Sequence, residues 1–232
     1  MSDVVIKDES LALSFTFGHE DDYYAKNGVF NPIKLTAYWD RSTSGTNDAF
    51  AIGPGLRYNA DNSKIQAGQV FTNDQAYDSG RNFMLNKVAP VVVQKVGGPD
   101  VWNNLTAEQQ AAYLDAGYNY GPYSKCLNDV YAAAGTGDKD TIAGQFSALS
   151  ANPARAADRA ALANGNYNGN VTKGGPSGKI PDNAQGAAPG TGAGCAGAGV
   201  GIFGAIAAAG LLGGFGAAVN TAMALASQAL GC

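Results

Sequence analysis

The stretch LALSFTFGHEDDYYAKNGVFNPIKLTAYWDRSTSGTNDAFAIGPG, residues 11–55, carries the pattern that decides the fold. Its first part, Leu11–Tyr24, predicts a helix in which apolar residues precede the polar run HEDD. KLTAYWD (Lys34–Asp40) alternates and is rich in β-branched and aromatic residues, so it predicts a strand. After the turn sequence SGTND, AFAIGPGLRY (49–58) predicts a second strand ending in a Gly-Pro-Gly bend. The stretch therefore indicates a helix followed by a small β-hairpin.

Helices dominate the sequence that follows the hairpin. Thr72 and Thr106 each precede acidic and amide residues, which is the pattern of a helix N-cap. Pro90 should interrupt or kink the first of these helices, because proline removes a backbone donor. The predicted helices cover residues 72–96, 106–118, 123–134, 141–149 and 153–163. A small sheet with a large helical remainder predicts an α+β fold.

Composition divides the chain into three parts. Residues 1–170 have the composition of a folded domain, and residues 171–199 are a linker rich in Gly, Pro and Ala. The last charged residue is Asp182 of 232, so residues 200–232 carry no charge. This Gly/Ala-rich segment exceeds the roughly 20 apolar residues that span a bilayer. It predicts a separate apolar helical segment that inserts into a membrane or packs against other helices, with docking inside a larger particle as the alternative.

Charge and cysteine content exclude several classes of function. The net charge is −4 and no Lys/Arg cluster offers a phosphate-binding patch, so we expect no nucleic-acid partner. Three cysteines without CxxC spacing and a single histidine make a zinc site or a His-based nucleophile triad improbable. We expect no metal and no cofactor. Cys195 and Cys232 bracket the apolar segment, and the sequence leaves open free thiols, a disulfide or an interchain bond.

The first ten residues, MSDVVIKDES, lack the positive start and apolar core of a signal peptide. The sequence therefore predicts synthesis in a cytoplasm, with another route for any role outside it.

Glycosidic hydrolysis is one chemistry that the hairpin region could support. It needs one protonated carboxyl group to donate to the leaving oxygen and one ionised carboxylate to activate water or attack the sugar. The candidates are the acidic residues in and around the predicted hairpin: Glu20, Asp21, Asp22, Asp40 and Asp48. Composition alone does not choose among them.

Three short motifs narrow the choice: HE at His19-Glu20, AYWD at 37–40 and AIGPG at 51–55. A helix ending in Glu, a strand ending in Tyr-x-Asp and a hairpin into x-Ile-Gly-x-Gly resemble the phage-type lysozymes, glycoside hydrolase family 24. Later segments are similar to that family in the same order, so that the resemblance extends over residues 15–165. These segments are VFTNDQAYDSGRNFMLNKVAPVVVQKV, LTAEQQAAYLDAGYNYGP, KCLNDVYAAAGTGDKDTIAGQFSAL and ARAADRAAL.

The resemblance implies a lysozyme-like fold with a small β-hairpin lobe and a larger helical lobe. It implies Glu20 as general acid and Asp40 as second carboxylate in cleavage between N-acetylmuramic acid and N-acetylglucosamine. Glu20 would then need apolar neighbours, such as Phe17 or Trp39, to hold its proton. The expected substrate-binding residues are Asn119, Tyr120 and Trp39. Asn119 could instead cap its helix.

Two features depart from the family pattern. The family has Thr before Ile-Gly, placed to hold the attacking water, where this chain has Ala51. The hydroxyl of Thr43, Ser44 or Thr46 would have to substitute, or catalysis is weakened. The 20-residue spacing of Glu20 and Asp40 is also long, which indicates an inserted loop before the first strand.

The sequence thus predicts a virion-borne muramidase that acts in the host periplasm and opens the cell wall during genome entry. Its expected partners are peptidoglycan and, through residues 200–232, a membrane or virion proteins. An endolysin acting at host lysis is the alternative with the same chemistry. A structural or membrane-docking virion protein that kept the fold and lost activity is the alternative from another class.

Overall fold

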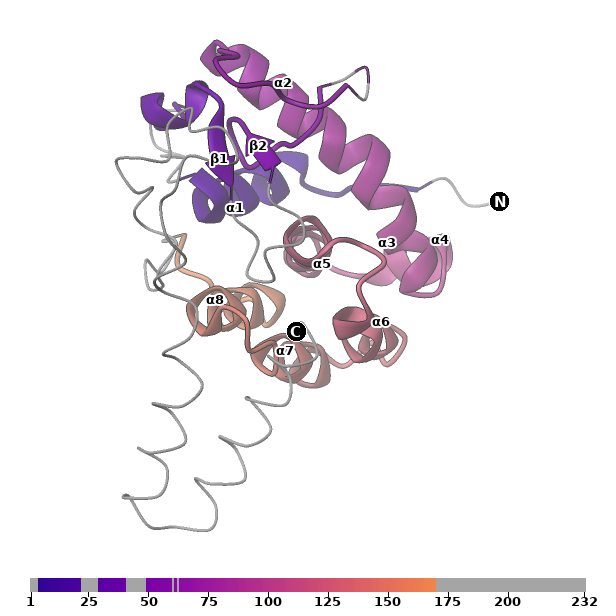
Figure 1. The fold of residues 1–232 in the computed structure, drawn as a ribbon. Helices are drawn as coiled ribbons and strands as arrows, with labels where there is room; N and C mark the ends of the chain where they lie inside the picture. Colours follow the sequence, from indigo (N-terminus) through magenta and orange to yellow (C-terminus); the bar gives the residue numbers. More distant parts are fainter. Residues whose placement is uncertain (1–3, 22–28, 41–48, 60, 62, 170–232) are drawn as a thin grey trace, which may run out of the picture.

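The computed structural model describes residues 4–21, 29–40, 49–59, 61 and 63–169 (Figure 1). The predicted linker and apolar segment, residues 171–232, lie outside the described residues, as do Thr43, Ser44 and Thr46. The division of the chain into three parts therefore stays a prediction. Within the described ranges, no helix combines the length and the apolar character needed to cross a membrane.

The described residues form short helices around one two-stranded antiparallel sheet, which confirms the α+β class. In chain order the elements are α1 (Glu9–Asp21), η1 (Pro32–Leu35), β1 (Tyr38–Asp40), β2 (Ala49–Ala51), α2 (Asn73–Phe83), η2 (Met84–Val88), α3 (Ala89–Lys95), α4 (Pro99–Asn104), α5 (Ala107–Tyr120), η3 (Lys125–Leu127), α6 (Asn128–Ala134), α7 (Lys139–Ser147) and α8 (Pro153–Ala163).

The hairpin is shorter than the sequence predicted. The strand expected from Lys34 begins only at Tyr38, because Pro32–Leu35 form a 3-10 turn. Proline fixes φ near the helical value and favours the first position of a helical turn. Tyr38 pairs with Ala51 and Asp40 with Ala49, and the predicted bend follows β2. There the main chains of Ile52 and Leu56 exchange two hydrogen bonds of 2.9 and 3.0 Å.

The predicted helix over 72–96 is present and is interrupted next to Pro90, as the sequence predicted. Thr72 forms a capping box with Gln75, as its sequence position predicted. Before Pro90 the helix widens into the π-helical turn η2, in which the Ala89 N–H bonds to the Met84 carbonyl. Because Pro90 has no N–H, this wider turn continues the chain into α3 without a regular α-helical bond at that position.

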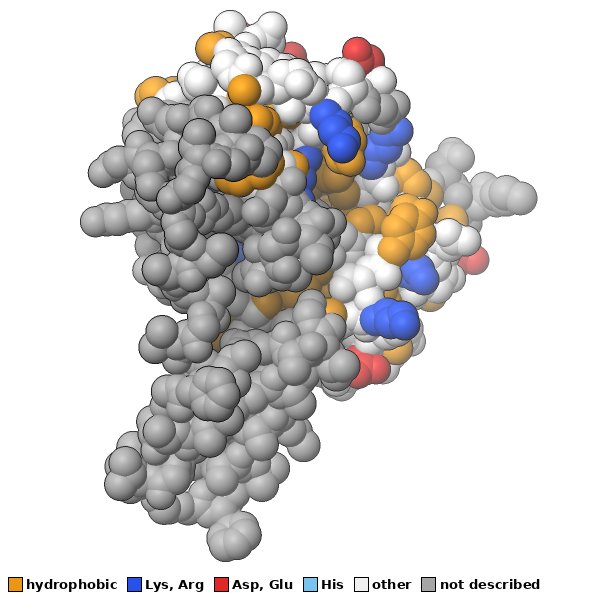
Figure 2. Space-filling model, viewed as in Figure 1, with side chains coloured by type: hydrophobic (Ala, Val, Ile, Leu, Met, Phe, Trp, Pro, Cys, Tyr) orange, Lys and Arg blue, Asp and Glu red, His pale blue; other side chains and the backbone are white. Residues whose placement is uncertain are grey.

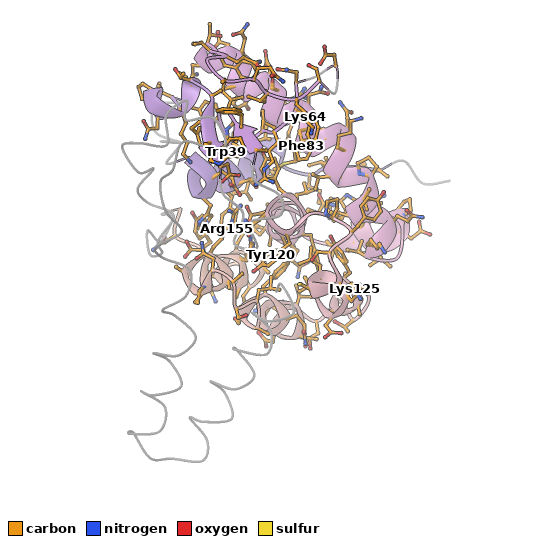
Figure 3. All side chains as sticks on the ribbon, in the orientation of Figure 1. Trp39, Lys64, Phe83, Tyr120, Lys125 and Arg155 are labelled. Carbon is orange, nitrogen blue, oxygen red and sulfur yellow. The ribbon has the colours of Figure 1, made fainter. Side chains whose placement is uncertain are left out.

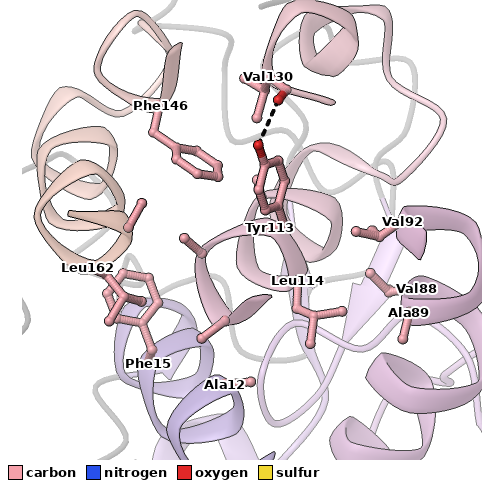
Figure 4. Packing of buried hydrophobic residues seen from close by; sticks show 14 of the residues in the cluster. Ala12, Phe15, Val88, Ala89, Val92, Tyr113, Leu114, Val130, Phe146 and Leu162 are labelled. Carbon is pink, nitrogen blue, oxygen red and sulfur yellow. Dashed lines mark hydrogen bonds between the residues drawn. The ribbon is translucent and has the colours of Figure 1, made fainter. Parts of the chain in front are cut away.

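Helix α5 lies at the centre of the molecule (Figure 1). It begins at a second capping box, made by Thr106 and Gln109 as predicted, and every residue from Gln109 to Gly117 is buried. Figure 4 shows Phe15, Val92, Phe146 and Leu162 packed around it. The Tyr113 hydroxyl donates to the Val130 carbonyl at 3.0 Å and ties α5 to α6. The main core therefore forms around one helix.

Helix α4 is the element that the sequence patterns missed. It starts at Pro99 and places Trp102 in the core with no exposed surface. The Trp102 Nε1 donates to the Val5 carbonyl at 2.9 Å, and so fixes the N-terminal segment against the helical lobe.

The last helices agree closely with expectation. The predicted helix over 153–163 is α8, and α7 begins two residues earlier than predicted, after the capping side chain of Asp138. The helix expected from Tyr123 starts at Asn128, because Lys125–Leu127 form a 3-10 turn. Cys126 in this turn is disulfide-bonded.

Two helical glycines allow a direct test of the packing on α5. A Cβ on Gly117 would lie 2.6 Å from Val92 Cγ2 and 3.0 Å from Val88 Cγ1, whereas a Cβ on Gly144 of α7 would meet nothing within 4 Å. Gly117→Ala should lower the free energy of unfolding by about 1–3 kcal/mol through overpacking. Gly144→Ala should raise it by up to about 1 kcal/mol, because alanine is the better helix former. Urea denaturation of both variants checks this, and equal effects would contradict the close packing.

Candidate functional site

Glu20 lies in the last turn of α1 and is partly buried. Its Oε1 accepts a hydrogen bond of 2.5 Å from Arg155 Nη1 of α8. A Cβ added to Gly55 would lie 3.5 Å from Glu20 Oε2, so the bend after β2 passes directly beside the carboxylate. Lys34 Nζ donates to the Glu20 backbone carbonyl. Elements far apart in the sequence thus converge on this residue.

The described partner of the Glu20 carboxylate is Arg155, and Phe17 and Trp39, the apolar neighbours expected from the sequence, have ring contacts with other residues. Phe17 is fully buried, and its ring packs against Phe30 and Tyr77. Trp39 packs edge to face against Phe50, with ring centroids 4.9 Å apart. The hydrogen bond described for the carboxylate is the one from Arg155.

Asp40 ends β1, and its side chain is 36% exposed. Its Oδ2 accepts hydrogen bonds from Arg57 Nη2 at 2.6 Å and from Arg57 Nε at 3.2 Å. Arg57 follows Gly55 by two residues, a span of about 7 Å in extended chain. The Glu20 carboxylate therefore lies beside Gly55, and the Asp40 carboxylate binds Arg57 two residues farther along the same segment.

The bend that carries this segment is tightly held. Gly53 and Gly55 adopt positive φ values of 55° and 80°, which agrees with the expectation that glycine permits a tight turn here. The Tyr118 hydroxyl of α5 donates to the Pro54 carbonyl at 2.8 Å. Gly80 of α2 lies so close to Pro54 that a Cβ would come within 2.9 Å of Pro54 Cγ. The segment beside Glu20 is held by contacts from α2 and α5.

Ala51, at the family's Thr position, is fully buried opposite Tyr38 in the hairpin. Trp39 and Phe50 lie on the opposite face of the hairpin from Ala51, because side chains alternate along a strand. In Figure 3, Trp39 lies at the hairpin, and Arg155 and Tyr120 lie below it at α8 and α5.

Asn119 and Tyr120, at the end of α5, both contact Arg159 of α8. The exposed Asn119 accepts a hydrogen bond of 2.9 Å from Arg159 Nη2 through its Oδ1. Helix α5 ends at Gly121 with φ 81°, and Asn119 bonds to α8 instead of capping its own helix. The Arg159 guanidinium carbon lies 5.4 Å from the centre of the Tyr120 ring.

Behind Glu20 lies an ion network that the sequence reasoning did not identify. Asp115 of α5 has no exposed surface, and Arg155 and Arg159 of α8 are also buried. Arg155 contacts Asp115 through Nη2–Oδ1 at 2.5 Å and Nε–Oδ2 at 3.1 Å. Arg159 Nε contacts Asp115 Oδ2 at 2.5 Å. One signal was available: Asp115 interrupts an apolar helix, and the two arginines are spaced i, i+4 on another.

This network determines which groups are charged. Burial alone would raise the pKa of Asp115, but Arg155 and Arg159 outweigh it and hold that pKa well below its usual range. Burial disfavours the charged form of Arg155, but Asp115 and Glu20 outweigh it and raise the Arg155 pKa. Asp115 is therefore ionised at neutral pH between two guanidinium groups.

His19, next to Glu20, is buried and uncharged at neutral pH. Burial is the main cause that lowers the pKa of His19 to about 4, opposed by the charge of Asp115. Its ring packs against Phe15 with centroids 4.8 Å apart, and its Nε2 lies 3.4 Å from Asp158 Oδ2.

The exposed face of this region combines apolar and basic side chains. Figure 2 shows hydrophobic side chains lying between Lys and Arg side chains on the described part of this face. The exposed Lys64 and Lys125 lie on either side of Phe83 and Tyr120 in the same view (Figure 3). Among the described residues, no group of three or more His, Cys, Asp or Glu side chains is placed to hold a metal ion.

Comparisons with known proteins do not identify a family for this chain. No protein-family model matches the chain, and no curated protein sequence matches it either.

The burial of His19 predicts a pH dependence of stability. With a native pKa of about 4 against 6.5 when exposed, the unfolded state binds more protons between these values. The free energy of unfolding should therefore fall as the pH drops through this window, by on the order of 3 kcal/mol.

Urea denaturation at about pH 7 and about pH 4.5 measures this loss, and His19→Gln should remove most of it. Asp115 contributes little in this window, because its own loss of stability begins only as the pH falls toward its unfolded-state pKa of 3.8. An equal loss in both proteins would contradict the assignment to His19.

Proposed function

We propose that this chain is a lysozyme-type peptidoglycan hydrolase that cleaves between N-acetylmuramic acid and N-acetylglucosamine. The observation that carries the proposal is the approach of Glu20 and Asp40, from α1 and β1, to the single segment Gly55–Arg57. Two carboxyl groups beside one fixed bend are the minimum that glycosidic cleavage needs. The resemblance of residues 15–165 to phage-type lysozymes assigns the same two residues.

The roles of the two groups are those that the resemblance to phage-type lysozymes implies. Glu20 acts as the general acid, and the proton it gives to the leaving oxygen leaves a carboxylate behind. Arg155 Nη1 is already placed on Oε1 and stabilises this negative charge as it forms. Asp40 is more exposed and bound to Arg57, and as the second carboxylate it activates water or attacks the sugar.

The substrate suits the face beside the two carboxylates. Peptidoglycan presents sugar rings and anionic groups, and this face offers aromatic side chains together with lysines. Trp39, Asn119 and Tyr120 are the proposed sugar-binding residues, and Asn119 is exposed as this role requires.

The proposed setting is a phage particle that opens the cell wall during genome entry, with residues 200–232 contacting a membrane or other virion proteins. Mass spectrometry of purified particles distinguishes this role from that of an endolysin, which would be absent from them. The second candidate function is a virion protein with a lysozyme-like fold and no turnover. Ala51, which offers no hydroxyl to hold water, favours it.

Glu20→Gln should lower the rate of peptidoglycan cleavage by about 10²–10⁴-fold, because an amide cannot donate the required proton. Glu9→Gln is the matched control: it removes a carboxylate from the same helix, where Glu9 pairs at the surface with Arg81. The control should keep wild-type activity. Clearing of purified peptidoglycan measures both variants, and near-normal activity of Glu20→Gln would reject Glu20 as the acid.

Ala51 can be tested with two side chains of the same shape. Thr and Val have the same branched shape and differ in a hydroxyl and a methyl, so Ala51→Val controls for the added bulk. If the missing hydroxyl limits catalysis, Ala51→Thr should turn over peptidoglycan faster than both Ala51→Val and wild type. Equal rates for Thr and Val would show that this position does not hold the attacking water.

A further inference from the structure

The charged groups behind Glu20 form a linear chain of alternating sign. Arg159 binds Asp115, Asp115 binds Arg155, and Arg155 binds Glu20, with closest contacts of 2.5 Å at each step. The inner three groups are buried, with side-chain exposures of 0% for Arg159 and Asp115 and 4% for Arg155. Only Glu20, with 19% exposure, meets the surface. The network therefore connects a dry interior to the proposed acid.

Arg155 divides its donors between two carboxylates. Its Nε and Nη2 face Asp115, and its Nη1 faces Glu20. The two contacts to Asp115 fix the plane of the guanidinium, as paired arginine–carboxylate bonds do. The remaining N–H is then aimed at Glu20 Oε1. Asp115 does not contact Glu20 in any described bond, so its influence runs through Arg155.

The sign of that influence follows from electrostatics. A guanidinium favours the ionised form of a neighbouring carboxylate, and a second negative charge on the same guanidinium weakens that effect. The charge of Asp115 therefore weakens the stabilisation of ionised Glu20 by Arg155. The charge of Arg159 in turn offsets part of the charge of Asp115. In a buried setting these charges are poorly screened.

Other titratable groups among the described residues lie near Glu20. On α1 itself, His19 is uncharged at neutral pH, since burial lowers its pKa to about 4. Asp158 of α8 faces His19. Lys34 of η1 donates to the backbone carbonyl of Glu20.

We propose that Asp115 is a positioning residue for the proposed hydrolysis: it aims Arg155 at Glu20 and, balanced by Arg159, sets how strongly Glu20 retains its proton. The inference rests on the proposed function for its catalytic meaning. It adds a buried residue that does not touch the substrate.

The test is the titration of Glu20 in the full chain, followed by its ¹³C carboxyl resonance, alongside the pH profile of peptidoglycan clearing. Asp115→Asn keeps the shape of the side chain and an oxygen acceptor for Arg155 but removes a negative charge, so it should move the Glu20 midpoint to lower pH. Arg159→Met removes a positive charge and should move it to higher pH. Each shift should be on the order of one pH unit. The high-pH limb of the activity profile should move in the same direction as the midpoint.

Opposite shifts distinguish this role from loss of packing, which would not reverse its sign between two variants of one network. Glu9→Gln, at the surface of the same helix, should leave the midpoint in place. Unchanged midpoints, or shifts of the same sign, would overturn the proposal. If Asp115→Asn does not fold, Arg159→Met decides alone: a rise supports the proposal and no change overturns it.

The two proposals can fail separately. The titration needs no substrate, so opposite shifts in a protein that does not clear peptidoglycan would reject the function and keep the positioning role. Clearing by wild type with unmoved midpoints would keep the function and reject the role of Asp115.

Discussion

The constraint on which this structure depends is the burial of an ionised aspartate in its central helix. Asp115 has no contact with solvent, and an unpaired charge there would cost several kcal/mol. Only α8 supplies described cations to it, from two successive turns. Pairing both arginines with one carboxylate fixes the position of α8 along α5. Because Arg155 also reaches Glu20, the same constraint fixes the end of α1.

The hairpin lobe is joined to this frame by a few specific contacts. Its small apolar cluster of Ala37, Ile52, Leu56 and Ile65 meets the main core through Phe71 and Phe83, which pack against both. The Tyr118 hydroxyl binds the Pro54 carbonyl, and Gly55 leaves room for Glu20. Since a three-residue hairpin has little stability of its own, these contacts decide where Asp40 and Arg57 lie.

Short-range sequence patterns predicted the helix caps and helix ends, because neighbouring residues determine these features. The threonine caps at Thr72 and Thr106, the bounds of α8 and the interruption before Pro90 all follow from neighbouring residues. The strand predicted from Lys34 includes the last two residues of the 3-10 turn Pro32–Leu35, because their alternation continues directly into β1. Two site contacts lay beyond such patterns, since Asp115 and Arg155 are 40 positions apart and Glu20 and Arg155 are 135. Motif order chose Glu20 and Asp40, but it could not show that arginines bind both.

A buried ion network is a costly way to dock two helices. Well-packed apolar side chains of similar volume often serve equally well or better, because they avoid the desolvation of each charge. In this chain the network does something that apolar packing could not. It connects the buried charge of Asp115, through Arg155, to one carboxylate oxygen of Glu20 near the surface. Arg155 would bind Glu20 without Asp115, but its plane would then be free to turn and its full charge would act on one partner. Asp115 fixes the plane of the Arg155 guanidinium and also shares its charge. The same three buried groups therefore set the register of α8 on α5 and the electrostatic environment of Glu20, so that folding and the proposed acid chemistry share a single set of bonds.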